Sequence, residues 1–175
     1  MPDKYKTAEI CLAAVKQDGQ ALQYVPDELK TAELCMEAIK TKESDDDLDS
    51  ESALQYVPEK LKTAELCLFA IKNNKYSYRY LPENIWTAKM SLNAVKRNGS
   101  MIEYIPEKFK TPEIYLEAVK SNGYMLDFIP EKFITEEMCL AAVKQEGSML
   151  QYVPEKLKTK EICFEALKQY SNILN

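Results

Sequence analysis

Apolar residues recur along the chain in a helical rhythm. In one segment they stand three and four residues apart, as in Ile10, Cys11, Ala14 and Val15, which is the spacing of one face of an α-helix and not the alternation of a strand. A polar stretch and a glycine separate that segment from a shorter apolar one, such as ALQYV, which a proline ends. The pattern predicts a helix of about three turns, a turn, and a second helix of one to two turns.

This two-helix pattern repeats with a period of 24 residues. A threonine marks the start of every unit, and the seven origins are Thr7, Thr31, Thr63, Thr87, Thr111, Thr135 and Thr159. Prolines follow the same rhythm, from Pro2 to Pro154. One interval is 32 residues instead of 24, and its surplus lies in the acidic stretch TKESDDDLDSES. We therefore expect one acidic loop insertion at about 41–52.

Residues at fixed offsets from the threonine predict how each helix begins and ends. The threonine hydroxyl suits a helix N-cap, and a lysine at offset 9 suits the carbonyl end of the helix. Glycine at offset 12 in four units, as in Gly19, predicts a left-handed C-terminal cap. The third unit has Lys75 at that offset, so we expect Asn73 or Asn74 to adopt the left-handed conformation instead.

These units favour an all-α fold. Neither helix of a unit could bury its apolar side alone, so the units should stack side by side. We predict an α-solenoid of about seven 24-residue helix-turn-short-helix repeats, forming a single repeat domain over residues 1–175. Exposed stacking faces on the first and last units would favour end-to-end self-association.

The segment AVKQDGQALQYVPDELKTAELCMEAIK resembles a known family of tandem repeats. It is similar to the short repeats of bacterial and protist proteins that are classified as a domain of unknown function, which share an A-V-x-x-x-G-x-x-L-x-[YF] core and a period near 24. The resemblance runs from Pro2 to Leu174. The chain differs in its proline after Tyr-Val and in Thr-x-Glu at the helix start. The resemblance implies an all-helical repeat and no agreed activity, so it provides no catalytic residues.

Composition narrows the classes of function. The chain contains no histidine, which removes histidine-based acid–base chemistry and histidine metal ligands. Its formal net charge of −5 is unfavourable for wrapping nucleic acid. No apolar run approaches the roughly 20 residues of a membrane span, and the N-terminus is too polar for a secretory signal. We expect a cytoplasmic protein that is not an enzyme, binds no cofactor or metal, and does not bind membranes or, in general, nucleic acid.

Three features of the sequence have a structural explanation that we prefer to a chemical one. The five cysteines share offset 4, where neighbouring repeats hold them about 8–10 Å apart, too far for a disulfide, so we expect core residues. The acidic insertion lacks the glycine and final glutamate of a calcium loop, which favours a solvated loop. An aromatic residue at offset 17 is expected in the core rather than in a base-stacking ladder. That aromatic column comprises Tyr24, Tyr56, Tyr80, Tyr104, Phe128 and Tyr152.

Departures from the repeat concentrate in the third and fourth units. Arg79 stands where other units carry polar or acidic residues, Trp86 takes a column filled four times by lysine and once by Ile134, and Lys89 replaces a glutamate near the start of the helix. Residues 70–100 carry a net charge of +5, and the rest of the chain carries −10. Aromatic and arginine residues at otherwise polar positions are typical of interface hot spots. We predict a partner-binding patch for an acidic protein or peptide, formed by Phe69, Lys75, Tyr76, Arg79, Trp86 and Lys89.

Other interpretations of this patch remain open. The same aromatic and basic residues could bind single-stranded nucleic acid, and an enzyme of unrecognised type is a third possibility. The acidic insertion carries a net charge of −5 and could neutralise the patch, with or without competing against a partner. The preferred hypothesis is a non-enzymatic scaffold for protein–protein interaction.

Overall fold

The computed structural model describes residues 7–41 and 52–171. These residues contain helices and no strand, and they build tandem repeats, so the predicted all-α repeat solenoid is confirmed. The acidic insertion at 41–52 lies almost entirely in residues 42–51, outside the described part. The chain divides into two compact units, residues 1–86 and 87–175.

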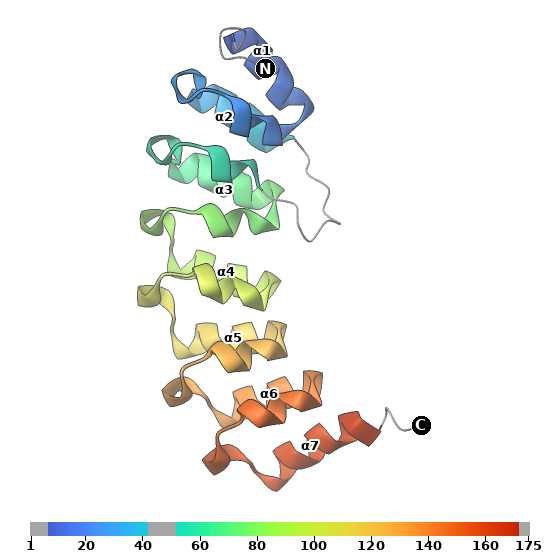
Figure 1. Cartoon of the computed structure of the whole chain (residues 1–175). Helices are drawn as coiled ribbons and strands as arrows, with labels where there is room; N and C mark the ends of the chain where they lie inside the picture. Colours follow the sequence, from blue (N-terminus) through green and yellow to red (C-terminus); the bar gives the residue numbers. More distant parts are fainter. Residues whose placement is uncertain (1–6, 42–51, 172–175) are drawn as a thin grey trace. The chain divides into compact units, whose positions relative to one another are not determined.

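The described residues of the first unit form three α-helices and the 3₁₀ helices that follow them (Figure 1). Their bounds are α1 Ala8–Gln17, η2 Gly19–Tyr24, η3 Asp27–Leu29, α2 Ala32–Lys40, η4 Ala53–Tyr56, η5 Glu59–Leu61, α3 Ala64–Asn73, η6 Lys75–Tyr80 and η7 Glu83–Ile85.

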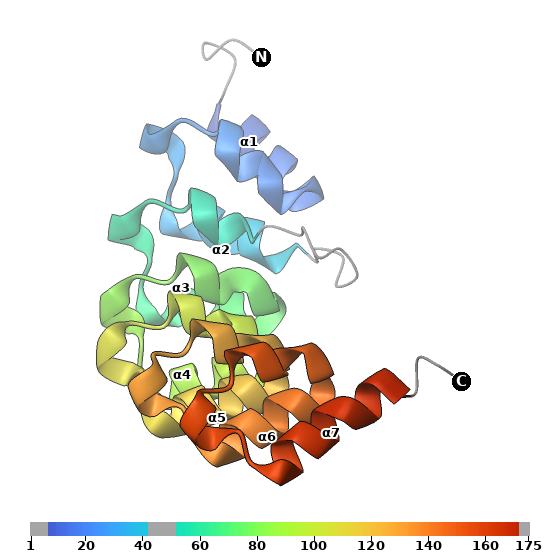
Figure 2. The ribbon, with the colours of Figure 1, turned by 60° about the horizontal axis from the view of Figure 1, so that its bottom comes forward.

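Within its described residues, 87–171, the second unit forms four α-helices, and successive ones lie side by side from α4 to α7 (Figures 1 and 2). Their bounds, with those of the 3₁₀ helices between them, are α4 Ala88–Arg97, η8 Gly99–Tyr104, η9 Glu107–Phe109, α5 Pro112–Ser121, η10 Gly123–Phe128, η11 Glu131–Phe133, α6 Glu136–Gln145, η12 Gly147–Tyr152, η13 Glu155–Leu157 and α7 Lys160–Ser171.

The threonine at each repeat origin caps its α-helix, as the sequence predicts. In all seven repeats the hydroxyl accepts a hydrogen bond from the backbone N–H three residues later, over 3.2–3.4 Å. Such a cap typically contributes about 1 kcal/mol. Pro112 occupies the start of α5, where a missing N–H leaves no hydrogen bond unmade.

The turn after each α-helix differs from the prediction. No described residue has a positive φ, so the expected left-handed glycine cap is wrong, and Asn74 is extended as well. Instead, the residue before the glycine is extended and its side chain caps the 3₁₀ helix: Asp18 Oδ1 accepts from the Gln20 N–H over 2.9 Å. Glycine is needed for space, since a Cβ at Gly99 would overlap the Ala118 carbonyl oxygen and lie 2.9 Å from Asn122 Cβ.

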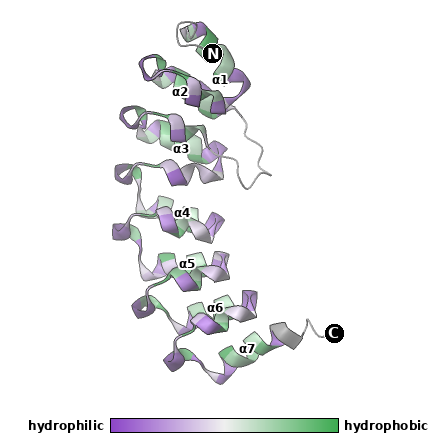
Figure 3. Ribbon diagram, in the orientation of Figure 1, coloured by the Kyte–Doolittle hydropathy of each residue, from purple (hydrophilic) through white to green (hydrophobic). Residues whose placement is uncertain are grey.

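The core runs along the columns at offsets 4, 7 and 8. Ala38, Ala118 and Val143 are fully buried. Four cysteines are buried as predicted, and the fifth, Cys163, is half-buried; all five are free thiols. Figure 3 shows hydrophobic residues mainly in the helices and hydrophilic residues mainly at the turns between them.

Most of the aromatic column at offset 17 lies outside the core, contrary to expectation: Tyr56 and Tyr80 are half-buried and pack against the core, and the other four members are exposed. Tyr24 is 67% exposed and Phe128 is 59% exposed. The reason is the 3₁₀ geometry of the second helix, which has three residues per turn. Residues three apart, such as Leu22 and Val25, are therefore buried, and Tyr24 between them points outward.

Lysines at offset 9 form ion pairs at the ends of the α-helices. Lys40 and Lys168 pair with the glutamate three residues earlier. Lys120 pairs instead with Glu137 of the next repeat, Nζ to Oε1, at 2.8 Å. The column thus contributes to contacts between repeats as well as within one helix.

Candidate protein-binding site

The structure buries the two largest rings of the predicted patch. Tyr76 is 7% exposed and Trp86 is 4% exposed, so neither side chain offers a surface anchor in this conformation. Phe69 on α3 is half-buried and packs against the core of the first unit. The six predicted residues therefore do not form one exposed aromatic patch, and their role in binding stays a prediction.

Trp86 is buried because its column is an interior one. The lysines at the same offset keep their charged ends at carboxylates while their stems are covered: the side chains of Lys30, Lys62 and Lys110 are 10%, 7% and 17% exposed. Lysine occupies such positions by burying its methylene stem. Trp86 fills the same space with a ring whose centroid lies 5.7 Å from that of Tyr78.

The basic residues of the patch are placed differently from one another. Arg79 is exposed, and its guanidinium carbon lies 5.2 Å from the centroid of the Tyr76 ring. Lys75 begins η6, but its side chain lies outside the described part. Lys89 is exposed on α4 and belongs to the second unit.

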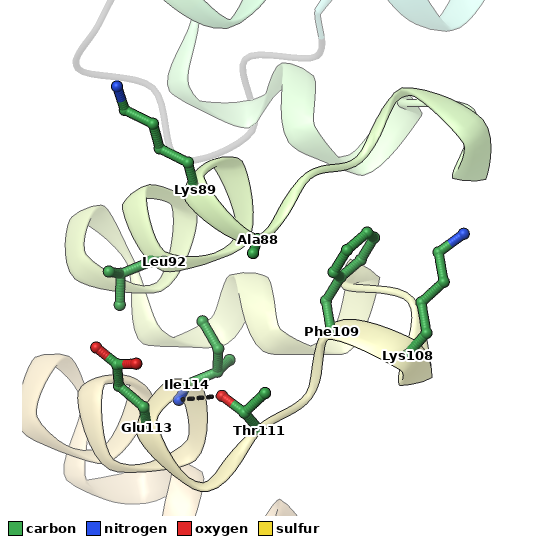
Figure 4. A pocket seen from close by; sticks show the side chains of 8 residues that line it. All are labelled: Ala88, Lys89, Leu92, Lys108, Phe109, Thr111, Glu113 and Ile114. Atoms are coloured by element: carbon green, nitrogen blue, oxygen red, sulfur yellow. Dashed lines mark hydrogen bonds between the residues drawn. The ribbon is translucent and has the colours of Figure 1, made fainter.

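Lys89 is the predicted site residue that lines a pocket. The pocket lies in the second unit, has a volume of about 400 Å³, and is open to solvent (Figure 4). Its apolar wall comes from three elements: Ala88 and Leu92 from α4, Phe109 from η9, and Ile114 from α5. The position of α5 is fixed locally by Thr111, whose hydroxyl accepts from the Ile114 N–H over 3.4 Å.

Charged side chains flank this apolar wall. Lys89 and Lys108 supply two cations, and Glu113 supplies one carboxylate. Figure 4 shows Lys89 and Lys108 extending outward at separate places along the wall, with Glu113 below Leu92. Lys108 Nζ lies 5.3 Å from the centroid of the Phe109 ring. The pocket can therefore accept an apolar side chain and attract carboxylates beside it.

Sequence reasoning found one residue of this pocket and missed its walls. Lys89 stood out because the other six repeats carry glutamate at the same offset. Leu92, Phe109 and Ile114 follow the ordinary repeat pattern, so nothing in the sequence marks them as pocket residues. Lys108, beside Phe109, is equally regular, because lysine recurs at its offset in other repeats.

Three of the buried thiols are poorly suited to nucleophilic chemistry. Burial raises the pKa of the Cys67 and Cys139 thiols to about 11, and desolvation also raises the pKa of Cys35. A thiol with a raised pKa is a poor nucleophile near neutral pH. Among the described residues no group of three or more histidine, cysteine or acidic side chains could hold a metal ion.

Comparison with known proteins identifies the repeat. The family described as Domain of unknown function (DUF4116) matches four times in tandem, over residues 8–45, 33–86, 90–134 and 135–175. The chain belongs to the DUF4116 family. No curated protein and no solved structure is significantly similar to this DUF4116 chain. In its described residues, none of the helices has the length and apolar character needed to cross a bilayer.

Proposed function

We propose that this DUF4116 chain is a non-enzymatic repeat scaffold for protein–protein interaction, and that the pocket lined by Lys89 binds an acidic segment of a partner. The observation that carries the proposal is the replacement of the repeat's glutamate by Lys89 beside an apolar pocket. A lysine in the first turn is unfavourable for the helix, which favours acidic residues there. A binding role gives this departure a reason.

The apolar wall would supply most of the affinity. Burying a leucine, isoleucine or phenylalanine side chain contributes about 1.5–3 kcal/mol. The pocket volume of about 400 Å³ is ample for one such side chain. Leu92 and Ile114 on opposite helices would contact it from two sides, with Phe109 closing the third.

The lysines would decide the sign of the partner's charge. Exposed ion pairs contribute only about 0.2–1 kcal/mol each. The lysines would therefore contribute more to specificity among segments than to the overall binding affinity. Lys89 and Lys108 favour carboxylates on either side of the buried side chain, and Glu113 disfavours a carboxylate on its own side. The expected ligand is a short segment in which an apolar residue stands next to aspartate or glutamate.

The proposal of a non-enzymatic role is supported by the buried thiols, which are protected from reaction. We also propose a cytoplasmic location, because free cysteines are typical of reducing compartments.

Nucleic acid is a less suitable ligand for this site, since the rings expected to stack with bases, Tyr76 and Trp86, are buried.

Selection from a random peptide display library tests this proposal. We expect wild-type protein to enrich peptides with an apolar residue beside carboxylates. Lys89→Glu, which restores the glutamate of the other six repeats, should weaken binding of an enriched peptide about tenfold, or about 1.4 kcal/mol. Lys60→Glu is the matched control, because Lys60 is exposed in the first unit and the first repeat carries Glu28 at the same offset.

Two results would count against the proposal. Enrichment of basic peptides would contradict the assigned charge, and equal binding by wild type and Lys89→Glu would place the site elsewhere. A random single-stranded oligonucleotide, tested in parallel at two salt concentrations, should not bind; strong salt-dependent binding would favour nucleic acid instead.

A further inference from the structure

The first and sixth repeats share an identical helix segment. Residues 11–17 and 139–145 both read Cys-Leu-Ala-Ala-Val-Lys-Gln. In the sixth repeat, α6 packs against both α5 and η10 of the preceding repeat. The sixth repeat therefore shows how this segment packs against another repeat.

One face of α6 docks on the preceding repeat. Met138 is 1% exposed and Ala142 is fully buried. Gln145 adds polar contacts: its Oε1 accepts from the Gly123 N–H over 2.9 Å, and its Nε2 donates to the Val119 carbonyl oxygen over 2.9 Å. At the other end of the face, Glu137 pairs with Lys120 of α5 at 2.8 Å.

The same face of α1 is open to solvent. Ile10, which matches Met138, is 45% exposed, and Ala14, which matches Ala142, is only half-buried. Gln17 and Glu9 hold the places of Gln145 and Glu137 and are both exposed. Thus α1 presents a complete docking face, apolar and polar parts together.

The opposite kind of face is open on α7. Leu167 is 62% exposed, whereas Val119, at the same offset in α5, is fully buried. Phe164 is 60% exposed, with Lys168 Nζ 4.8 Å from its ring centroid. Lys168 also stands at the offset of Lys120, the lysine that receives Glu137.

We propose that α1 of one copy of the chain docks on α7 of a second copy, as α6 docks on α5. Ile10 and Ala14 would cover Phe164 and Leu167, and Glu9 would pair with Lys168. The contact joins two different faces, so each copy keeps one of each kind and further copies can add head to tail. This interface uses none of the residues that line the pocket at Lys89, and it does not depend on the proposed acidic ligand.

Complementation between two charge variants tests the proposal. Ile10→Glu removes the α1 face and Leu167→Glu removes the α7 face; both residues are exposed, so neither change should disturb folding. In sedimentation experiments on the full chain we expect the wild-type mass to grow with concentration and each variant to stay monomeric. An equimolar mixture should form a 1:1 heterodimer and nothing larger, because only one intact pair of faces remains. Gln23→Glu, an exposed charge control on η2, should associate like wild type.

Three outcomes would overturn the proposal. A wild-type protein that stays monomeric at all concentrations would show that the faces do not meet. Association of either variant alone would show that another surface is responsible, including a symmetric contact of α7 with α7. Failure of the mixture to form a heterodimer, with both variants folded by circular dichroism, would show that α1 does not dock on α7.

Discussion

The backbone N–H of Gly123 donates a hydrogen bond to Oε1 of Gln145, one repeat further along the chain. The two atoms are 2.9 Å apart, and Gly123 is buried, so the bond satisfies an amide that water does not reach. Ser121 has the same relation to Gly99, whose N–H lies 3.1 Å from the serine Oγ. Side chains ten residues after the repeat threonine therefore hydrogen-bond to the turn of the preceding repeat and stabilise the contact between the two repeats.

Replacing Gln145 by alanine should loosen this junction. The change leaves the buried Gly123 N–H and the Val119 carbonyl without their side-chain partner, which typically costs about 1–3 kcal/mol. Urea unfolding measures the loss, and amide exchange at Gly123 should accelerate. Gln151→Ala, at an exposed position of the same unit, should change neither. Equal losses of stability in the two variants would contradict a stabilising role of the Gln145 hydrogen bonds between the repeats.

Two glycine substitutions should differ in cost although both glycines occupy the same offset. Gly99→Ala places a methyl group against the Ala118 carbonyl oxygen and 2.9 Å from Asn122 Cβ, so the repeats must separate. Gly123→Ala meets its nearest atom, the Ala142 carbonyl oxygen, at 3.1 Å. We expect the first change to cost about 2–3 kcal/mol of unfolding free energy and the second clearly less. A larger loss of unfolding free energy for Gly123→Ala than for Gly99→Ala, measured by urea unfolding, would contradict the closer packing at Gly99.

The register of the repeat could be predicted from sequence because its signals are local. A threonine hydroxyl three residues from a free N–H and a proline at the start of a helix act within one turn, so all seven caps were predictable. The reason for glycine in the turns could not be predicted, because it comes from a neighbouring repeat. Gly99 is required by the closeness of the Ala118 carbonyl oxygen and not by a positive φ angle.

Two errors of the prediction concern exposure to solvent. The pattern assigns Tyr24 to the core because α-helical spacing is assumed, and the 3₁₀ helix turns it outward. The prediction places Trp86 at the surface because lysine shares its column, yet those lysine stems are covered. Trp86 follows η7 in an extended conformation, so residue type alone reveals neither which side of a short helix nor which position beside it faces the core. The walls of the pocket at Lys89 were unpredictable for the same reason.

Trp86 should behave as a core residue. Its burial predicts a blue-shifted fluorescence maximum, and the signal is unambiguous because the chain has one tryptophan. Trp86→Ala should lower the unfolding free energy by about 3–5 kcal/mol, while Phe128→Ala, at an exposed aromatic position, should stay within about 0.5 kcal/mol of wild type. A solvent-like emission maximum together with unchanged stability would restore the surface role.

Alkaline pH should destabilise the fold through its buried thiols. The pKa of Cys67 and Cys139 is raised to about 11 in the folded chain, against about 8.5 for an unfolded cysteine. The unfolded state therefore loses these protons first, and the stability present below about pH 8.5 falls as pH rises toward 11. Urea unfolding between these pH values measures the fall. The Cys67→Ala/Cys139→Ala variant should show a shallower fall, and an identical slope would contradict the assignment.

Reversing the charge on both the protein and the peptide tests whether the pocket at Lys89 recognises an acidic segment. The measurement is the affinity of wild type and Lys89→Glu for one enriched peptide and for its version with lysine in place of the carboxylate. We expect wild type to prefer the acidic peptide and Lys89→Glu to prefer the lysine version, each by several-fold. The same preference in both proteins would contradict it.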